Sequence, residues 1–385
     1  MSSDQEKITI TAECLCKTHT FNAEIPTSEL PLKAVICHCN SCRHVTGALY
    51  SMGATWPVAA KDVDTSTLIT YQFSDDITIL FCGTCSSGCF FEWTKRPGEL
   101  GVITGVLKNH DVDLVKIMYH MHVEDTIDGG ATMWLRKPNV NGDEIPRFKS
   151  RSQGEEYPHD WPPSSSLSGY HAKLECGELS IQCHCKGVDL ILKPGNYQGK
   201  TDEELPWFID PRNHKPKATF DVCDSCRLQS GVDIFHWTFS ELTNIFYSSS
   251  SEGAGKAFPV STAELKAAVD ADDPQMGTLA YYKSSPDVQR YFCKNCSAMV
   301  FYAVDDRPDI VDVAIGLLNA PDGARAESFL SWTFGDSPSW ADDTKGGWRE
   351  GLWQRVQAEA EQWRNERGYP KSWKSIQQEE KESKE

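Results

Sequence analysis

The sequence lacks the features that mark a membrane protein, a secreted protein or a nucleic-acid binder. Its longest apolar stretches, such as 311–318, are far shorter than the roughly 18 residues of a membrane-spanning helix. The amino terminus is polar and has no basic segment leading into an apolar one, so we expect no secretory signal. Lysine and arginine form no dense block, and the net charge is −17. Because such a charge repels phosphate, we expect neither nucleic acid nor a membrane among the partners.

The sequence has instead a globular composition with many cysteines. Its hydrophobic fraction is 39% and its charged fraction 24%, which is typical of a soluble folded protein. With no secretory signal expected, the 15 cysteines indicate a reducing compartment, and we expect a cytoplasmic protein. Clustered cysteines in such a compartment are more often metal ligands than disulfide partners.

The cysteines fall into short groups that occur twice in the same order. In the first half the groups are Cys14 and Cys16, then Cys37, Cys39 and Cys42, then Cys82 and Cys85. In the second half they are Cys183 and Cys185, then Cys223 and Cys226, then Cys293 and Cys296. Only Cys89 and Cys176 stand outside a group. Because unrelated cysteines would not repeat this order, we predict two copies of one cysteine-rich domain.

These groups divide the chain into four parts. We expect a first zinc-binding domain at 1–135, a Pro/Ser-rich linker at 136–170, a second zinc-binding domain at 171–343, and a C-terminal helix with a charged tail at 344–385. The second domain carries an insertion near 248–277, because its last two cysteine groups lie 67 positions apart, compared with 40 in the first.

Short β-branched and aromatic runs, broken by Gly, Pro, Asp and Ser, predict a mainly β fold in both copies. An Ala-rich stretch at 261–270 predicts a helix within the insertion. Near the C-terminus Trp348, Leu352, Val356 and Ala360 recur every four residues opposite a polar face, the pattern of an amphipathic helix. Two interpretations of this helix stay open, because it could cover the sheet of the second domain or bind a partner.

The spacing of the cysteines predicts two kinds of zinc site. Zinc binds four thiolates in a tetrahedron with Zn–S bonds of about 2.3 Å, so two pairs from distant parts of the chain complete a closed, structural site. The middle group, Cys37-His-Cys39-Asn-Ser-Cys42, offers only three thiolates within six residues. A shell that lacks one ligand is what catalysis or the capture of a substrate thiol requires.

The order CxC, CHCxxCR and FCxxC resembles the glutathione-dependent formaldehyde-activating enzyme family, which is grouped with centromere protein V. The resemblance covers about 10–130 and 175–335, as two tandem copies. It implies an Mss4-like, mainly antiparallel β fold, a structural zinc at the CxC and CxxC pairs, and a second zinc, open to a thiol, at the CxCxxC group. The family usually has a glycine after each pair, where this sequence has Lys17, Ser86, Lys186 and Ser297.

Carried over by position, the resemblance assigns the zinc ligands. The structural site of the first copy would be Cys14, Cys16, Cys82 and Cys85, and that of the second copy Cys183, Cys185, Cys293 and Cys296. The open, catalytic zinc of the first copy would be held by Cys37, Cys39 and Cys42. In the second copy a carboxylate replaces the first cysteine, so Asp221, Cys223 and Cys226 could form a harder, less thiolate-rich site.

Five further side chains have two interpretations each. His38 is either a proton-handling residue near the bound thiol or a solvent-facing spacer. Arg43 and Arg227 either bind a substrate carboxylate or donate to backbone carbonyls around the zinc turn. His120 and His122 are expected on one face of a strand, near a position where the family has a histidine, and each is either functional or an ordinary core or surface side chain.

These features predict a zinc-dependent carbon–sulfur lyase that acts on thiol–aldehyde adducts such as S-(hydroxymethyl)glutathione. A small-molecule thiol resembling glutathione, held as a thiolate at the open zinc, would add to the aldehyde carbon. We expect the first copy to carry this chemistry, because its middle group has three thiolates, and the insertion is a candidate cover for the second site. The alternative is a non-catalytic, zinc-stabilised thiol carrier or protein-interaction module.

Overall fold

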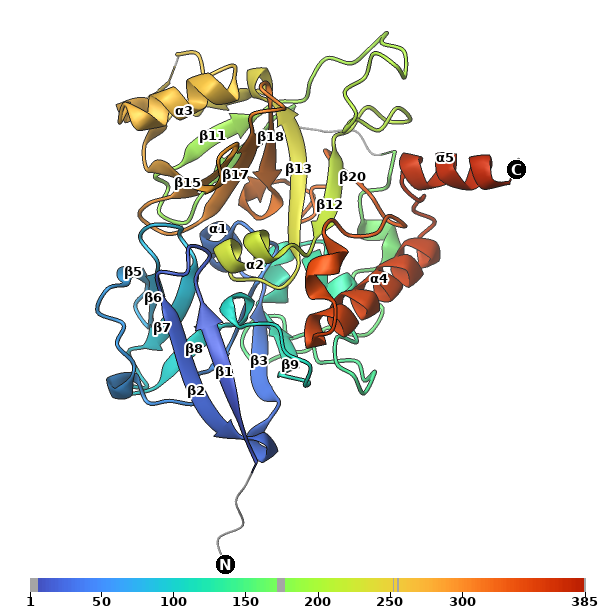
Figure 1. The fold of residues 1–385 in the computed structure, drawn as a ribbon. Coiled ribbons are helices and arrows are strands. Elements are labelled where there is room, and N and C mark those ends of the chain that lie inside the picture. The colour runs from blue at the N-terminus through green and yellow to red at the C-terminus, as the bar shows by residue number, and fades with distance from the viewer. Residues whose placement is uncertain (1–5, 172–176, 252, 255, 384–385) are drawn as a thin grey trace, which may run out of the picture.

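The protein, seen in a computed structural model, forms two β domains and a C-terminal pair of helices (Figure 1). The structure describes residues 6–171, 177–251, 253–254 and 256–383. Each domain is built around a sheet of seven strands. The mainly β prediction is therefore confirmed.

The first seven-stranded sheet has the order β5-β6-β7-β8-β4-β3-β9. Its strands are β3 (Leu32–Cys37), β4 (Ser51–Thr55), β5 (Ile69–Ser74), β6 (Ile77–Phe81), β7 (Gly88–Trp93), β8 (Leu100–Ile103) and β9 (Val115–Met121). The second has the order β15-β16-β17-β18-β13-β12-β20. Its strands are β12 (Lys217–Asp221), β13 (Phe235–Glu241), β15 (Leu279–Ser285), β16 (Val288–Cys293), β17 (Met299–Val304), β18 (Ile310–Ala314) and β20 (Ser331–Trp332).

The two sheets have the same topology. Each strand of the first sheet has a counterpart at the same place in the second, and neighbours are antiparallel except for β3 with β9 and β12 with β20. A smaller sheet accompanies each one. It consists of β1 (Lys7–Glu13) and β2 (Thr20–Pro26) in the first domain, and of β10 (Leu179–Gln182), β11 (Asp189–Leu192), β14 (Ile245–Tyr247) and β19 (Leu318–Asn319) in the second. The shared order extends the repeat of cysteine groups to the backbone.

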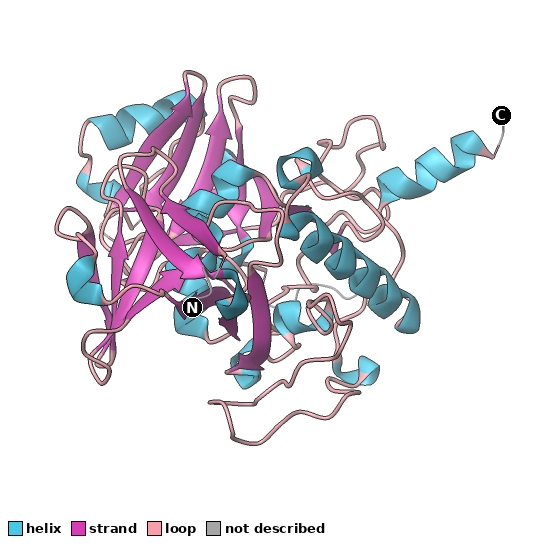
Figure 2. Ribbon diagram, turned by 60° about the horizontal axis from the view of Figure 1, so that its bottom comes forward, coloured by secondary structure: helices cyan, strands magenta, loops and turns pink. Residues whose placement is uncertain are grey.

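Short helices continue the repeat, and longer ones are added to it. α1 (Asn40–Thr46) and α2 (Asp224–Ser230) each begin directly after a cysteine of the middle group. The helix predicted in the insertion is α3 (Thr262–Asp270). At the C-terminus α4 (Trp348–Glu366) confirms the predicted amphipathic helix, and α5 (Trp373–Glu382) follows it. Figure 2 shows α5 extending away from the β domains.

Two reciprocal backbone contacts join the domains. The Gly105 amide donates to the Gly231 carbonyl at 3.0 Å, and the Gly316 amide donates to the Gly47 carbonyl at 2.9 Å. Gly47 and Gly231 end α1 and α2 in the left-handed conformation, with φ of 78° and 79°. A β-carbon on Gly47 would lie 2.2 Å from the Met299 carbonyl oxygen. Position 47 therefore requires glycine for two reasons, its left-handed backbone conformation and the closeness of the other domain.

α4 packs on both domains rather than on the second alone. On the second-domain side Val356 and Ala360 face a narrow gap that Val222 also lines. On the first-domain side the buried Arg349 donates from Nη2 to the Thr104 carbonyl at 3.0 Å, while its Nε bonds Asp233 of the second domain at 2.7 Å. The interpretation of α4 as a cover for the second sheet is thus too narrow, because this helix fastens the two domains together.

The Pro/Ser-rich segment at 136–170 packs against the first domain. The Phe148 amide donates to the His120 carbonyl of β9 at 2.9 Å. Arg147, which is 2% exposed, donates to the carbonyls of Pro158 and Trp161 at 2.9 and 2.8 Å. The segment has little regular structure but is fixed by these bonds.

Among the described residues no helix is both long and apolar enough to cross a membrane.

Gly47→Ala tests the joint between the domains. Gly98 also has a positive φ, of 91°, but a β-carbon there would meet nothing within 4 Å. The control Gly98→Ala should therefore cost only the backbone penalty, about 1–2 kcal/mol. Gly47→Ala should lower the free energy of unfolding in urea by more than about 3 kcal/mol, because the Met299 carbonyl must also move. Equal losses in the two variants would mean that the joint does not limit stability.

Candidate metal centres

The two CxC and CxxC pairs of the first copy converge on one point. Cys14 and Cys16 follow β1, Cys82 and Cys85 follow β6, and their four sulfurs lie within 4.8 Å of one another. The Cys16 sulfur is 3.5 Å from that of Cys14 and 3.6 Å from that of Cys82. A zinc tetrahedron with bonds of about 2.3 Å sets its sulfurs about 3.8 Å apart, so this donor set fits zinc.

The second copy repeats this arrangement. Cys183, Cys185, Cys293 and Cys296 lie within the same 4.8 Å limit, and the Cys185 sulfur is 3.6 Å from Cys183 and 3.4 Å from Cys293. In both copies a backbone amide points at the first sulfur, from His19 to Cys14 at 3.3 Å and from Val188 to Cys183 at 3.2 Å. Amide donors of this kind favour the thiolate that zinc requires.

The turns at these pairs have the positive φ that favours glycine, although the residue at that position is not glycine in any of them. The residue after each pair has a positive φ, which is 60° at Lys17, 62° at Ser86, 62° at Lys186 and 65° at Ser297. In all four turns the amide of this residue donates to the carbonyl of the first cysteine of the pair, at 2.9–3.0 Å. The departures from the family pattern therefore leave the turns intact, at a conformational cost of about 1–2 kcal/mol each.

The middle group of the first copy forms a three-sulfur cluster. Cys37 ends β3, Cys39 caps the N-terminus of α1 and Cys42 lies in its first turn. The Cys37 and Cys39 sulfurs are 3.5 Å apart, and the Cys42 amide donates to the Cys39 sulfur at 3.3 Å. No fourth His, Cys, Asp or Glu joins the cluster among the described residues. Three of the tetrahedral positions are thus provided by the chain.

His38 does not face solvent. Its exposed fraction is 0%, and its Nε2 lies 2.9 Å from Nδ1 of His120, which is equally buried. His120 Nε2 lies 2.9 Å from the Leu135 carbonyl, so this nitrogen carries the hydrogen of the His120 ring. Nδ1 of His120 therefore accepts a hydrogen bond from Nε2 of His38. Burial lowers the pKa of His120 to about 3 and that of His38 well below its usual value, so both rings are neutral at pH 7. The pair fixes the cysteine turn on β9.

His122 is not on the face of His120. β9 ends at Met121, and His122 has a φ of 53°, in the left-handed region. The prediction that both histidines share one face of a strand is therefore wrong, because the chain turns between them. His122 is half-buried at this turn.

The middle group of the second copy brings together Asp221, Cys223 and Cys226, whose ligand atoms also lie within 4.8 Å of one another. The Cys226 amide donates to the Cys223 sulfur at 3.2 Å, as in the first copy. Asp221 occupies the position of Cys37, at the end of β12. Arg290 of β16 donates from Nη1 to the Cys226 sulfur at 3.4 Å and is 5% exposed. This cluster has one thiolate fewer and one guanidinium more than its counterpart.

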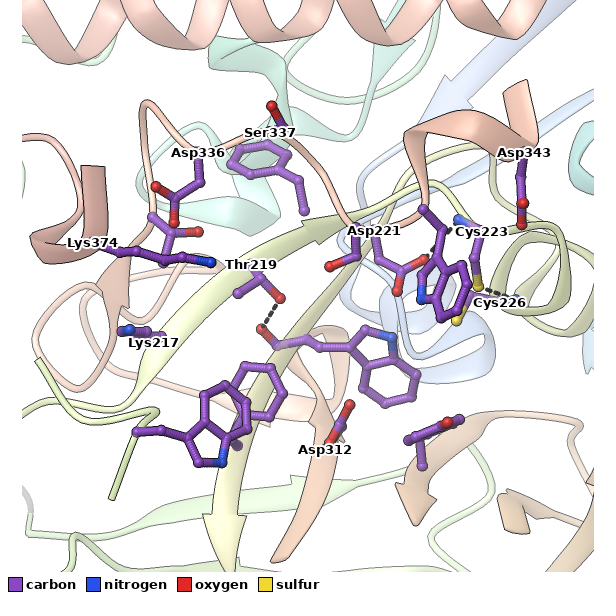
Figure 3. A pocket seen from close by; sticks show the side chains of 18 of the residues that line it. Lys217, Thr219, Asp221, Cys223, Cys226, Asp312, Asp336, Ser337, Asp343 and Lys374 are labelled. Carbon is purple, nitrogen blue, oxygen red and sulfur yellow. Dashed lines mark hydrogen bonds between the residues drawn. The ribbon is translucent and has the colours of Figure 1, made fainter. Parts of the chain in front are cut away.

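A cavity of about 1110 Å³ lies over the second-copy cluster (Figure 3). Asp221, Cys223 and Cys226 line it together with Arg290 and Asp312. No described residue of 248–277 is among its lining residues, so the described part of the insertion does not cover it. Its walls include instead residues of α5 and of the segment before α4. Part of the charged tail predicted within 344–385 thus borders this cavity.

In the first copy, the sheet residues at the positions that correspond to this cavity are apolar. Strand position pairs four residues of the second sheet with four of the first. Arg290 corresponds to Ile79, Tyr302 to Phe91, Trp237 to Gly53 and Asp312 to Gly101. The Phe91 ring lies over both glycines, because a β-carbon would be 2.7 Å from it at Gly53 and 2.3 Å at Gly101. This polar set was not predicted from the sequence. Its signals were a charged Arg290 three residues before Cys293 and an Asp312 within the mainly apolar stretch 311–318.

Two cysteines remain outside the clusters. Cys89 is fully buried in the core of the first domain. Cys176 lies outside the residues that the structure describes. The fourteen described cysteines are all free thiols, as a metal-binding role requires.

A family model described as glutathione-dependent formaldehyde-activating enzyme matches residues 9–125. The matched segment contains all three cysteine groups of the first copy. The match does not extend to the second copy, whose similarity to the first is seen in the shared strand order and cysteine clusters. A search of curated proteins found no match.

The clusters predict the metal content of the protein. Purified, reduced protein should contain at least three zinc ions per chain, two in the closed clusters and one in the three-sulfur cluster. A fourth ion would occupy the cluster with Asp221. Inductively coupled plasma mass spectrometry gives the count directly. One ion or none per chain would contradict the metal assignment.

Two substitutions should separate a closed cluster from an open one. Cys82→Ser removes one of four ligands from a site whose binding energy contributes to folding, so it should cost about 3 kcal/mol or more. Cys42→Ser removes a ligand from the three-sulfur cluster and should leave the melting temperature closer to that of the wild type. Thermal unfolding of the zinc-loaded variants measures both effects. Equal losses of stability would remove the distinction between the two kinds of site.

Proposed function

We propose that the protein is a zinc-dependent enzyme of the carbon–sulfur lyase type that acts on adducts of a thiol and an aldehyde, such as S-(hydroxymethyl)glutathione. The observation that carries this proposal is the three-sulfur cluster of Cys37, Cys39 and Cys42. It lies within the segment that the family model matches and leaves one position of a zinc shell for a ligand from outside the chain.

Cys37, Cys39 and Cys42 would hold the zinc, and the four-cysteine clusters would hold structural ions. Zinc in such a site supplies a position at which a thiol is bound as its thiolate at neutral pH. The surrounding residues favour thiolates, because the Cys42 amide points at the Cys39 sulfur. The neutral pair of His38 and His120 holds the turn rigid without adding charge. The chain therefore orients its three sulfurs before any ligand arrives.

The proposed reaction forms a C–S and an O–H bond and breaks the carbonyl π bond and the S–H bond. The thiol sulfur bonds to the aldehyde carbon while the carbonyl π bond opens, the thiol loses its proton, and the adduct oxygen gains one. The reverse reaction releases the thiol and the aldehyde. We assign the exchange of this proton to His122, a histidine half-buried at the turn that follows β9.

The cavity over Asp221, Cys223 and Cys226 favours a second location for the same chemistry. It has room for a tripeptide thiol, and Arg290 would balance the charge of the cluster. A carboxylate ligand makes a zinc site harder, which favours oxygen over sulfur as the added ligand. We therefore place thiol binding at the first copy, and we treat the second cluster as the competitor that the next experiment tests.

Two finer features accompany this proposal. We propose that both copies have the Mss4-like fold, for which the shared strand order and paired cysteine turns are the support. A cytoplasmic location also fits, because clusters of free thiols persist in a reducing compartment. Neither feature is needed for the reaction.

Cys39→Ser and Cys223→Ser decide which copy is active. Assayed with glutathione and formaldehyde, Cys39→Ser should lower kcat/KM at least 100-fold, because it removes a ligand from the thiol-binding cluster. Cys223→Ser, its counterpart at the N-terminus of α2, should retain most of the activity.

The reverse pattern would place the chemistry in the second copy. Full-rate turnover in both variants would rule out both clusters as the reactive site. A wild-type protein that binds zinc and glutathione but never turns over would support a thiol carrier in place of an enzyme.

A further inference from the structure

A second cavity lies between the two copies, beside α1, the helix that carries Cys42. Its volume is about 590 Å³. On one side it is lined by Asn40, which follows Cys39 directly, and by Arg43 and Asp125. On the other side it is lined by second-copy residues of β10 and of the segment 319–324. A ligand in this cavity would touch both domains.

Arg43 is buried against this cavity without a full set of partners. Its exposed fraction is 4%, and its Nη2 donates to Asn40 Oδ1 at 2.5 Å. Among the described residues, its Nε and Nη1 have no hydrogen-bond partner. An unsatisfied buried donor costs about 1–3 kcal/mol, and more when it is charged. The two nitrogens are thus available to an acceptor that the described residues do not supply.

Arg227, at the matching position of the second copy, shows that an arginine here need not lack hydrogen-bond partners. It follows the last cysteine of the second-copy group, as Arg43 does in the first, and it is also 4% exposed. Its Nη1 donates to the carbonyls of Gly105 and Leu107, and its Nε donates to Asp224 Oδ1 at 3.1 Å. Arg227 therefore serves the backbone, whereas Arg43 retains free donors at the cavity.

The cavity also contains a carboxylate. Oδ2 of Asp125 accepts a hydrogen bond from the Asn40 backbone amide at 3.0 Å. Burial lowers the pKa of Arg43, and the charge of Asp125 raises it by a smaller amount. Asp128 acts on Arg43 in the same direction, but its oxygens accept the amides of Gly130 and Arg325 at 2.8 Å. One wall thus presents a guanidinium with free donors beside a carboxylate. An α-amino acid group has the complementary pair of charges.

The far wall of the cavity is held firmly. The Ala324 amide donates to the Thr126 carbonyl at 2.9 Å, and the Arg325 amide donates to Asp128. These bonds tie the second-copy wall to the first-copy residues beside Arg43. A cavity formed in advance needs little ordering when a ligand binds.

We propose that this cavity binds the α-amino acid end of a peptide thiol whose sulfur occupies the three-sulfur cluster. The ligand carboxylate accepts from Arg43, and the ligand ammonium faces Asp125. This assignment rests on the proposed thiol-binding function of the first copy. It names Arg43 as a specificity-determining residue and gives the second copy a role in forming the binding site.

The test compares three peptides by titration calorimetry with the zinc-loaded full chain. Glutathione has both charged groups, 4-aminobutyryl-cysteinyl-glycine lacks the α-carboxylate, and glutaryl-cysteinyl-glycine lacks the α-amino group. The wild type should bind glutathione at least tenfold more tightly than either analogue. Arg43→Gln should bind glutathione and the 4-aminobutyryl peptide within twofold of each other. The control Arg96→Gln, at a remote exposed arginine, should keep the wild-type preference.

Asp125→Asn provides an independent variant if Arg43→Gln does not fold. It should abolish the preference for glutathione over the glutaryl peptide while keeping the preference over the 4-aminobutyryl peptide. A wild type that binds all three peptides equally, or that binds none, would overturn the inference. Selective binding without turnover of formaldehyde would instead overturn the proposed enzymatic function and leave the inference standing.

Discussion

Thiolates held as close together as these must be balanced by a cation. Each closed cluster places four sulfurs within 4.8 Å of one another. Four negative charges at that distance repel strongly in a buried site, so the cluster is stable either with protonated thiols or with a metal ion. The positive φ of Lys17, Ser86, Lys186 and Ser297 adds a conformational cost at every turn. A metal ion bound in each cluster would provide the free energy to offset both costs.

The two copies show what remains fixed when a domain is duplicated and what changes. Strand order, closed clusters, cysteine turns and the glycines that end α1 and α2 are the same in both. The middle group, the sheet floor and the arginine after the last cysteine differ. Asp221 replaces Cys37, Trp237 and Asp312 replace Gly53 and Gly101, and Arg227 is fully bonded where Arg43 is not. These differences lie around the two clusters of three ligand residues.

The sequence was sufficient to predict the clusters, because its grouped cysteines resemble those of a family in which the CxC and CxxC pairs share one metal site. It also predicted the β fold and the helices α3 and α4, whose signals are local. It could not predict the burial of His38, because the partner His120 lies 82 residues away in the chain and joins it only through the pairing of β3 with β9. The cavity over Asp221 and the joint formed by Gly47 and Gly105 were missed for the same reason. Both arise where distant segments meet, and one sequence contains no record of that contact.

The most direct test of the account is zinc K-edge X-ray absorption of the zinc-loaded full chain, with and without glutathione. If the cluster of Cys37, Cys39 and Cys42 holds a zinc that accepts a thiol, the mean number of sulfur ligands per zinc should begin below four. It should rise toward four when glutathione is added, with Zn–S distances of about 2.3 Å. The same experiment on Cys39→Ser should show no rise. An unchanged sulfur count in the wild type would contradict the claim that this cluster binds a substrate thiol.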